Sequence, residues 1–67
     1  MKFTIRCEER LDGSWLAEIR ELNVNVESRS AMEALGKVQA MALRELARRI
    51  ETGQAPAGVV SITFVTG

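Results

Sequence analysis

Few residues of this chain could take part in catalysis. The 67 residues include one cysteine, Cys7, and no histidine, which excludes an ordinary Ser–His or Cys–His nucleophile pair. With one cysteine and no histidine, a structural zinc site is almost excluded and an internal disulfide cannot form. The glycines do not have the spacing of a phosphate-binding loop. We therefore expect no enzyme activity, no metal and no other cofactor.

Carboxylates are the remaining candidates for chemistry. A two-metal nuclease would need several of them at one point. Glu8 and Glu18 could approach each other on one face of a hairpin, but Arg6 and Arg20 alternate along the same face. The last sixteen residues contain no acid at all. These charges are typical of a solvated ion-pair face rather than of a metal centre.

The single tryptophan, Trp15, follows an Asp-Gly turn and could either stack on a ligand or fill the core. A stacking platform needs further aromatic and basic residues around it. The only other aromatic residues are Phe3 and Phe64, and both have the spacing of core positions. We predict that Trp15 packs in the core, with its indole N–H near the hairpin end. Cys7 lies on the same face, and we interpret it as a small buried hydrophobe.

Length and charge limit the class of protein. The chain is long enough for one domain, residues 1–67. Nine basic and nine acidic residues cancel, which gives no electrostatic basis for nucleic-acid binding. No apolar run is long enough for a signal peptide or a membrane span. We expect a cytoplasmic protein with no membrane association.

Alternation of apolar and polar residues predicts strands over residues 2–9 and 15–20, and a weaker strand near 24–27. The loop between the first two strands sets which faces coincide. A two-residue loop would pair Cys7 with Glu18 and bring charge into the core. A three-residue loop, Leu11–Gly13, pairs Cys7 with Ala17 instead and ends on the glycine that such loops require.

A long helix is the clearest pattern in the chain. Ser30 precedes it and Glu33 stands three residues later, which is a capping box, and Gly53 ends it. The side predicted to be buried comprises Leu35, Val38, Gln39, Ala42, Leu46 and Ile50. The opposite side carries Glu33, Lys37, Arg44, Arg48 and Glu51.

Residues 58–67 predict a last strand with Val60, Ile62 and Phe64 on its core face. The order is then β-β-β-α-β. A right-handed crossover places the last strand parallel to the first and beside it, which gives the sheet order 3-2-1-4. The predicted fold class is α+β, with one hairpin-based sheet covered on one face by a single long helix.

Two features predict self-association. A helix of this length measures about 32 Å, whereas a six-residue strand measures about 20 Å, so the last helical turns extend past the sheet. The final strand has no charged residue to protect an open edge from pairing with another chain. The alternative is that this strand is central in the sheet or covered by its own chain. A small core also favours a homodimer or tetramer. The residues predicted to be involved are Val59, Ser61, Thr63, Val65, Leu46 and Ile50.

The order of several short patterns resembles the HicB-like antitoxin family. They are an aromatic-apolar first strand, "DGSWLAEI", a following "EL", small polar residues before a helix beginning "xxEAL", and the tail "VQAMALRELARRIETGQAPAGVVSITFV". The tail is similar to that of the short, stand-alone members. The resemblance implies a β-β-β-α-β domain likened to a truncated RNase H fold. It also implies binding to HicA, a small basic mRNA-cleaving toxin.

The chain departs from that family in two respects. Many members add a DNA-binding domain after the last strand, whereas this sequence stops at Gly67, so no DNA binding is expected. The family's Pro-x-Leu-Pro-Gly-like segment is here Arg20–Val24, without proline or glycine. If that bend meets the toxin, the partner-facing residues are Glu21, Leu22, Asn23 and Val24.

Three functions follow from these observations. The first is a non-catalytic antitoxin-type module that blocks a HicA-like toxin by occlusion. The second is an orphan oligomerisation or small-ligand-binding domain of the same fold with no toxin partner, which the balanced charge and the missing bend favour. A remnant nuclease ranks last because no carboxylate cluster is present to perform cleavage.

Overall fold

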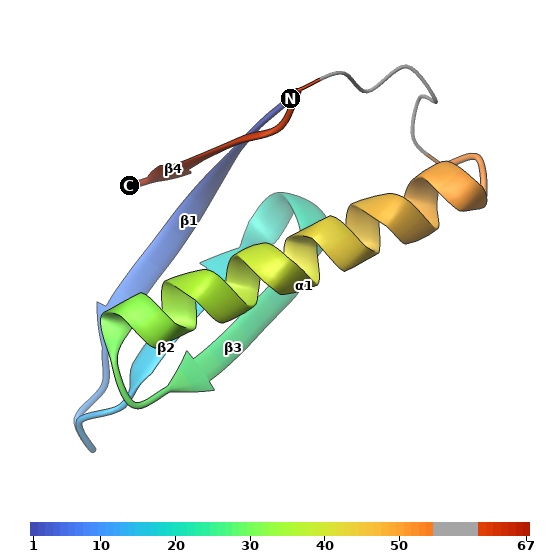
Figure 1. The fold of residues 1–67 in the computed structure, drawn as a ribbon. Helices are drawn as coiled ribbons and strands as arrows, with labels where there is room; N and C mark the ends of the chain where they lie inside the picture. The colour runs from blue at the N-terminus through green and yellow to red at the C-terminus, as the bar shows by residue number, and fades with distance from the viewer. Residues whose placement is uncertain (55–60) are drawn as a thin grey trace.

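The chain folds into one four-stranded mixed sheet with a long helix across one face (Figure 1). The structure is a computed structural model that describes residues 1–54 and 61–67. Its sheet order is β3-β2-β1-β4, with β4 parallel to β1 and the other neighbours antiparallel. The predicted α+β class, element order and strand order are therefore confirmed. The elements are β1 (Lys2–Glu9), β2 (Trp15–Ile19), a 3₁₀ turn η1 (Arg20–Leu22), β3 (Val24–Ser28), α1 (Ala31–Glu51) and β4 (Thr63–Thr66).

The first hairpin has the predicted register. Cys7 pairs with Ala17, and the loop is closed by the backbone N–H of Arg10, which donates to the Ser14 carbonyl at 2.8 Å. Gly13 has φ 88°, the left-handed conformation that costs a glycine little. Asp12 completes the turn because its Oδ1 accepts from the Ser14 N–H at 2.9 Å. Turn chemistry and strand alternation thus select the same register.

The ends of α1 also follow from local sequence. The Ser30 Oγ accepts a hydrogen bond from the Glu33 N–H at 3.1 Å, which satisfies one of the free N–H groups of the first turn. At the other end Gly53 has φ 77°, and the N–H of Gln54 donates to the Arg49 carbonyl at 2.7 Å. This is the glycine-terminated helix end that the sequence predicts.

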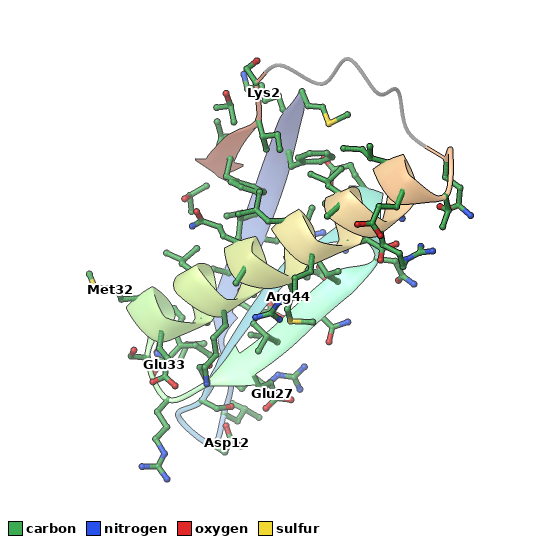
Figure 2. The ribbon with its side chains drawn as sticks, turned by 45° about the vertical axis from the view of Figure 1, so that its right-hand side comes forward. Lys2, Asp12, Glu27, Met32, Glu33 and Arg44 are labelled. Carbon is green, nitrogen blue, oxygen red and sulfur yellow. The ribbon has the colours of Figure 1, made fainter. Side chains whose placement is uncertain are left out.

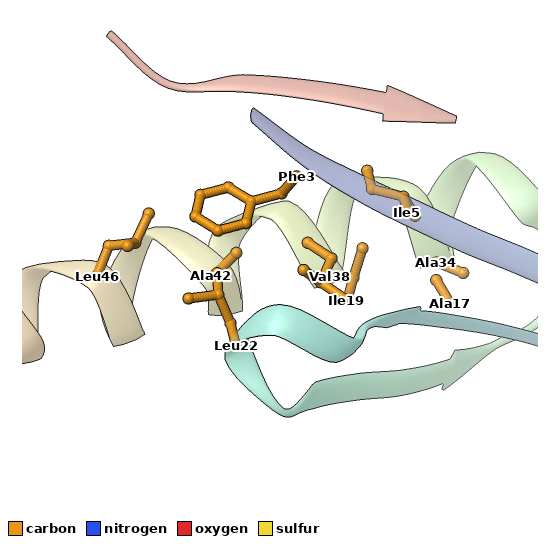
Figure 3. Packing of buried hydrophobic residues seen from close by; sticks show 9 residues of the cluster. All are labelled: Phe3, Ile5, Ala17, Ile19, Leu22, Ala34, Val38, Ala42 and Leu46. Carbon is orange, nitrogen blue, oxygen red and sulfur yellow. The ribbon is translucent and has the colours of Figure 1, made fainter. Parts of the chain in front are cut away.

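The core lies between α1 and the sheet and is built from small and branched residues (Figure 3). Its helical members agree with the predicted set at Val38, Ala42 and Leu46 and differ from it at the other positions. Ala34 is fully buried, whereas Leu35, Gln39 and Ile50 are half-buried. A buried alanine lets the helix axis approach the sheet more closely than leucine would, and it faces the equally buried Ala17. The buried hydrophobic residues are Phe3, Ile5, Ala17, Ile19, Leu22, Ala34, Val38, Ala42 and Leu46.

Trp15 and Cys7 lie on the helix side of the sheet, as predicted, but neither is fully buried. Both are half-exposed and pack against the edge of the core. For Cys7 the reason is the position of α1, which contacts β2 and β3 more extensively than β1. Trp15 is the first residue of β2, at the hairpin end of the sheet. Cys7 is therefore a partly covered free thiol rather than a buried hydrophobe.

The described part of the last strand agrees with the predicted faces. Phe64 pairs with Phe3 in the parallel register, and their ring centroids are 6.1 Å apart. Ile62 and Phe64 are half-buried on the helix side. The predicted core position Val60 lies outside the described residues.

Candidate functional site

A hollow of about 470 Å³ lies where the first hairpin meets the start of α1 (Figure 2). Three short segments converge there because β3 ends next to the hairpin loop and only two residues separate its end from the start of α1. The lining residues are Asp12, Gly13, Ser14, Glu27, Ser28, Arg29, Glu33 and Lys37. Sequence reasoning did not find this hollow, since its parts are separated along the chain.

The charged groups around the hollow are largely paired with one another. Lys37 Nζ lies 2.8 Å from Glu33 Oε1, and this contact, together with the charge of Lys37, lowers the pKa of Glu33. On the other side, Arg10 Nε lies 3.9 Å from Glu27 Oε1. Paired, solvated charges of this kind leave little attraction for an ionic ligand.

In the hollow, the Ser14 hydroxyl lies within hydrogen-bond distance of two carboxylates, Asp12 and, at 3.4 Å, Glu27 Oε2, which resembles the start of a nucleophilic site. The Ser14 Oγ donates to Asp12 Oδ1 at 2.6 Å. Hydrogen bonds from the hydroxyl and the N–H of Ser14, followed by the charge of Arg10, lower the pKa of Asp12. A carboxylate with a lowered pKa is a poor general base. The Ser14–Asp12 pair therefore shapes the turn rather than activating the serine.

Ser28 is the one buried polar side chain in the described part of the chain. It is 9% exposed, it pairs with Trp15 across the ladder, and its Oγ has no hydrogen-bond partner. An unsatisfied buried hydroxyl costs stability. The sequence offered a weak signal, because Ser28 continues the inward-facing alternation of Val24 and Val26.

The bend after β2 forms without proline or glycine. Residues Arg20–Leu22 make a 3₁₀ turn, and Asn23 supplies the left-handed residue with φ 55°, which asparagine tolerates better than most side chains. Leu22 is only 3% exposed and belongs to the core. Of the four residues predicted to face a partner, Glu21 and Asn23 are exposed, and Val24 is half-buried. The Glu21 Oε2 accepts from the Thr4 N–H at 3.3 Å.

The residues predicted for self-association lie in two separate places. Thr63 is exposed and Val65 is half-buried on the edge strand β4, which pairs with β1 alone. The exposed Ser61 lies two residues before this strand. Val59 lies outside the described residues. In the parallel register, Thr63 and Val65 stand beside Lys2 and Thr4, on the sheet face turned away from α1.

The helical residues predicted to need cover behave differently from each other. Leu46 is 4% exposed and lies beside Phe3 and Ala42 (Figure 3), so its own chain covers it. Ile50, one turn later, is half-buried. The helix extends past the ends of β2 and β3 (Figure 1), but the predicted overhang begins after Leu46 rather than before it.

The open face of the sheet carries the expected mixture of charges. Arg20 Nε lies 3.3 Å from Glu18 Oε1, and Arg6 stands opposite Glu18 in the β1–β2 register. A hollow of about 210 Å³ is lined by residues of this face, Arg6, Glu8, Leu16, Glu18 and Arg20, together with Gly67 and with Cys7 of the opposite face. The face is suited to polar contacts with a protein surface.

Among residues 1–54 and 61–67, no three side chains of the metal-binding types lie close enough together to hold an ion. In the same residues, no helix is long and apolar enough to cross a membrane. Comparison with protein-family models, characterised proteins and solved structures finds no match to this chain.

Proposed function

We propose that this protein is a non-catalytic, HicB-like antitoxin-type module that neutralises a small, HicA-like mRNA-cleaving toxin by covering it. The observation that supports the proposal is the fold itself. The β-β-β-α-β order and the β3-β2-β1-β4 sheet are those expected of a HicB-like domain, and they accompany the sequence resemblance over nearly the whole chain. Such a module would act in the cytoplasm, where the mRNA cleaved by the toxin is translated.

The surface offered to the toxin would combine the bend with the open face of the sheet. Glu21 and Asn23 project from the bend, and Glu18 and Arg20 lie on the open face next to it. Because acidic and basic groups alternate here, recognition would depend on shape and local hydrogen bonds rather than on a large negative field. This surface is separate from α1, which covers the other face.

Co-expression with the product of an adjacent small reading frame tests the proposal. We expect the two proteins to co-purify and the growth arrest caused by the toxin to be relieved. Glu21→Arg should weaken both effects, because it reverses a charge at the exposed bend. Glu51→Arg, on the far end of α1, serves as the matched control and should leave both unchanged. Absence of both co-purification and rescue with the unaltered protein would disprove the antitoxin role.

A second candidate is an orphan domain of the same fold that assembles or binds a small ligand without any toxin. Burial of Leu22 favours it, because a bend that packs into its own core offers fewer side chains to a partner. The neighbouring genes distinguish the two functions. A gene for a basic protein of about 60–80 residues, the size of one double-stranded-RNA-binding unit, supports the toxin partner, and its absence supports the orphan domain.

A further inference from the structure

We propose that the uncharged outer face of α1 is a contact surface between two copies of this chain, with the two helices packed antiparallel about a two-fold axis. The inference concerns self-association and goes beyond the proposed toxin-binding role. It also differs from the self-association surface that the sequence predicts, which is centred on β4.

Helix α1 has three faces rather than the two of a simple amphipathic helix. At about 100° per residue, one face packs on the sheet and a second carries Glu33, Lys37, Arg44, Arg48 and Glu51. The remaining charged residues, Glu45 and Arg49, are half-buried at the rotation of the packed face and pair with each other. The third face carries no charge and runs through Met32, Gly36, Gln39, Ala40, Leu43 and Ala47, and the half-buried Ile50 continues it by one further turn. We call the part of this face from Met32 to Ala47 the stripe. It lies on the side of α1 away from β3, since Val24 of β3 shares a groove with Met41 and Arg44 of the charged side. Figure 2 shows Met32 and Glu33 leaving the first turn in different directions.

This third face is unpartnered within the protomer. Met32 is 84% exposed and Leu43 is 47% exposed. They are two of the four large apolar residues exposed in the described part of the chain, and the only two on α1. Large exposed side chains aligned on one uncharged helix face are typical of an interaction site rather than of ordinary surface.

Gly36 provides a second, independent observation. A glycine inside a helix lowers its stability, so its presence there usually has a packing reason. A Cβ built at Gly36 meets no atom within 4 Å, and Gly36 is not among the residues with positive φ. Neither the backbone nor the packing of its own chain therefore requires glycine at this position. Close approach of a second helix would require it.

The spacing of large and small residues on this face is self-complementary. The stripe is symmetric about the point between Gln39 and Ala40, so an antiparallel copy places Leu43 over Gly36 and Met32 over Ala47. Each contact joins a large side chain to a small one, and a two-fold axis makes each contact twice. This match between size and spacing is the reason for choosing a second copy as the occupant.

Charge also favours a second copy over the toxin. A basic toxin would find no acidic group on this face, whereas a second copy presents the same neutral surface. The charged side of α1, with Lys37 and Arg44, stays in water in such a dimer. A contact one helix wide is small compared with a standard interface of about 800 Å² per partner. We therefore expect association that depends on protein concentration.

Sedimentation of the chain alone tests the proposal, from about 1 µM to about 1 mM, the range over which weak dimers form. The unaltered protein should form dimers as the concentration rises. Leu43→Lys and Gly36→Leu should be monomeric throughout with an unchanged circular dichroism spectrum, because both positions face open space in the protomer. Lys37→Leu, which places the same leucine one residue further along but on the charged side, is the control and should still dimerise.

Thiol cross-linking tests the antiparallel register. In a Cys7→Ala background, a mixture of Gly36→Cys and Leu43→Cys copies should form a disulfide-linked pair on oxidation, while each variant alone should not. A parallel arrangement would instead link Gly36→Cys to itself and would overturn the proposed geometry.

Three outcomes contradict the proposed contact. They are a monomer at every concentration, a dimer that persists in Leu43→Lys, and a dimer that is broken by Val65→Lys but not by Leu43→Lys. The last result would assign the contact to the edge of β4. None of these measurements involves a toxin, so failure of the antitoxin proposal would leave this test unaffected.

Discussion

The two glycines at Gly36 and Gly53 provide the sharpest test of the reasoning, because the same substitution should have opposite effects at the two sites. At Gly36 the backbone is helical and an added methyl group meets open space. Replacing glycine with alanine inside a helix gains about 1 kcal/mol, since alanine restricts the unfolded chain and favours helix. We expect Gly36→Ala to raise the free energy of unfolding of the isolated protomer by about 1 kcal/mol.

At Gly53 the expectation reverses. Its φ of 77° places the backbone in the left-handed region, where a Cβ is unfavourable by roughly 1–2 kcal/mol. A Cβ there also meets no atom within 4 Å, so the cost of Gly53→Ala comes from the backbone alone. For a domain of this size, 1 kcal/mol corresponds to a change of about 4–8 °C in the melting temperature. The two variants should therefore melt on opposite sides of the unaltered protein.

The assay is urea unfolding followed by circular dichroism, at a protein concentration low enough for the monomer to dominate. The comparison is then repeated at high concentration, where Gly36→Ala should lose part of its advantage, because the added methyl group fills the space expected to receive Leu43 of a second copy. A Gly36→Ala protomer that is less stable than the unaltered one at low concentration would refute the account of α1. It would mean that the chain itself requires glycine there.

Three further predictions concern single side chains. Ser28→Ala should increase the free energy of unfolding by up to about 1 kcal/mol, measured by urea unfolding, because it removes a buried hydroxyl without a partner; a loss of stability would show that the hydroxyl is satisfied in solution. Hydrogen bonds from Arg48, then from Arg49, lower the pKa of Glu45 from 4.5 to about 2. The Glu45 carboxylate therefore contributes fully to the free energy of unfolding at pH values above the pKa it has in the unfolded chain, and this contribution is lost as the pH falls toward 2. Glu45→Gln removes the titrating group, so the free energy of unfolding of this variant should decline less steeply between pH 5 and pH 2. Ile62→Lys should destabilise the fold strongly because Ile62 packs against the core, whereas Thr63→Lys on the exposed side should not; equal melting temperatures for the two would contradict the placement of β4.

Local patterns were sufficient to predict most of the fold. The register of the β1–β2 hairpin follows from alternation with period two and from the glycine at the end of the loop, both of which act within a few residues. The limits of α1 follow from the Ser30 cap and Gly53 for the same reason. The strand order needed one further rule, the right-handed crossover, which applies to parallel strands in general.

Core membership was harder to predict, because it depends on the distance between helix and sheet. Sequence reasoning chose the larger Leu35, but the structure buries Ala34 next to Ala17. The predicted and observed buried faces differ by a rotation of the helix about its axis that is smaller than the angle of about 100° between successive residues. The spacing of apolar residues in the sequence cannot specify so small a rotation. Leu22 was likewise predicted to face a partner, and it is buried because the 3₁₀ turn directs it back under α1.

Of the two candidate surfaces, one could have been predicted from the sequence and the other could not. The neutral face of α1 could have been found from the sequence by separating the uncharged helical positions into buried and outward-facing ones, since Gly36 and Leu43 are seven residues apart. The hollow beside Ser28 could not, because it is formed by the hairpin loop, the end of β3 and the start of α1. Only the antiparallel pairing of β2 with β3 brings these segments together.

The sequence by itself determined the four strands and the helix, the ends of α1, the hairpin register and the order of the strands, but neither the 3₁₀ turn η1 nor the start of β4 at Thr63. The features that it did determine depend on backbone preferences and on side-chain periodicity, which are properties of neighbouring residues. The tertiary structure decided which side of α1 faces the sheet, that Leu22 and Leu46 are covered by their own chain, and that Met32 and Leu43 are left exposed. These outcomes depend on how closely two surfaces approach, which is set by the packing of side chains far apart in the sequence.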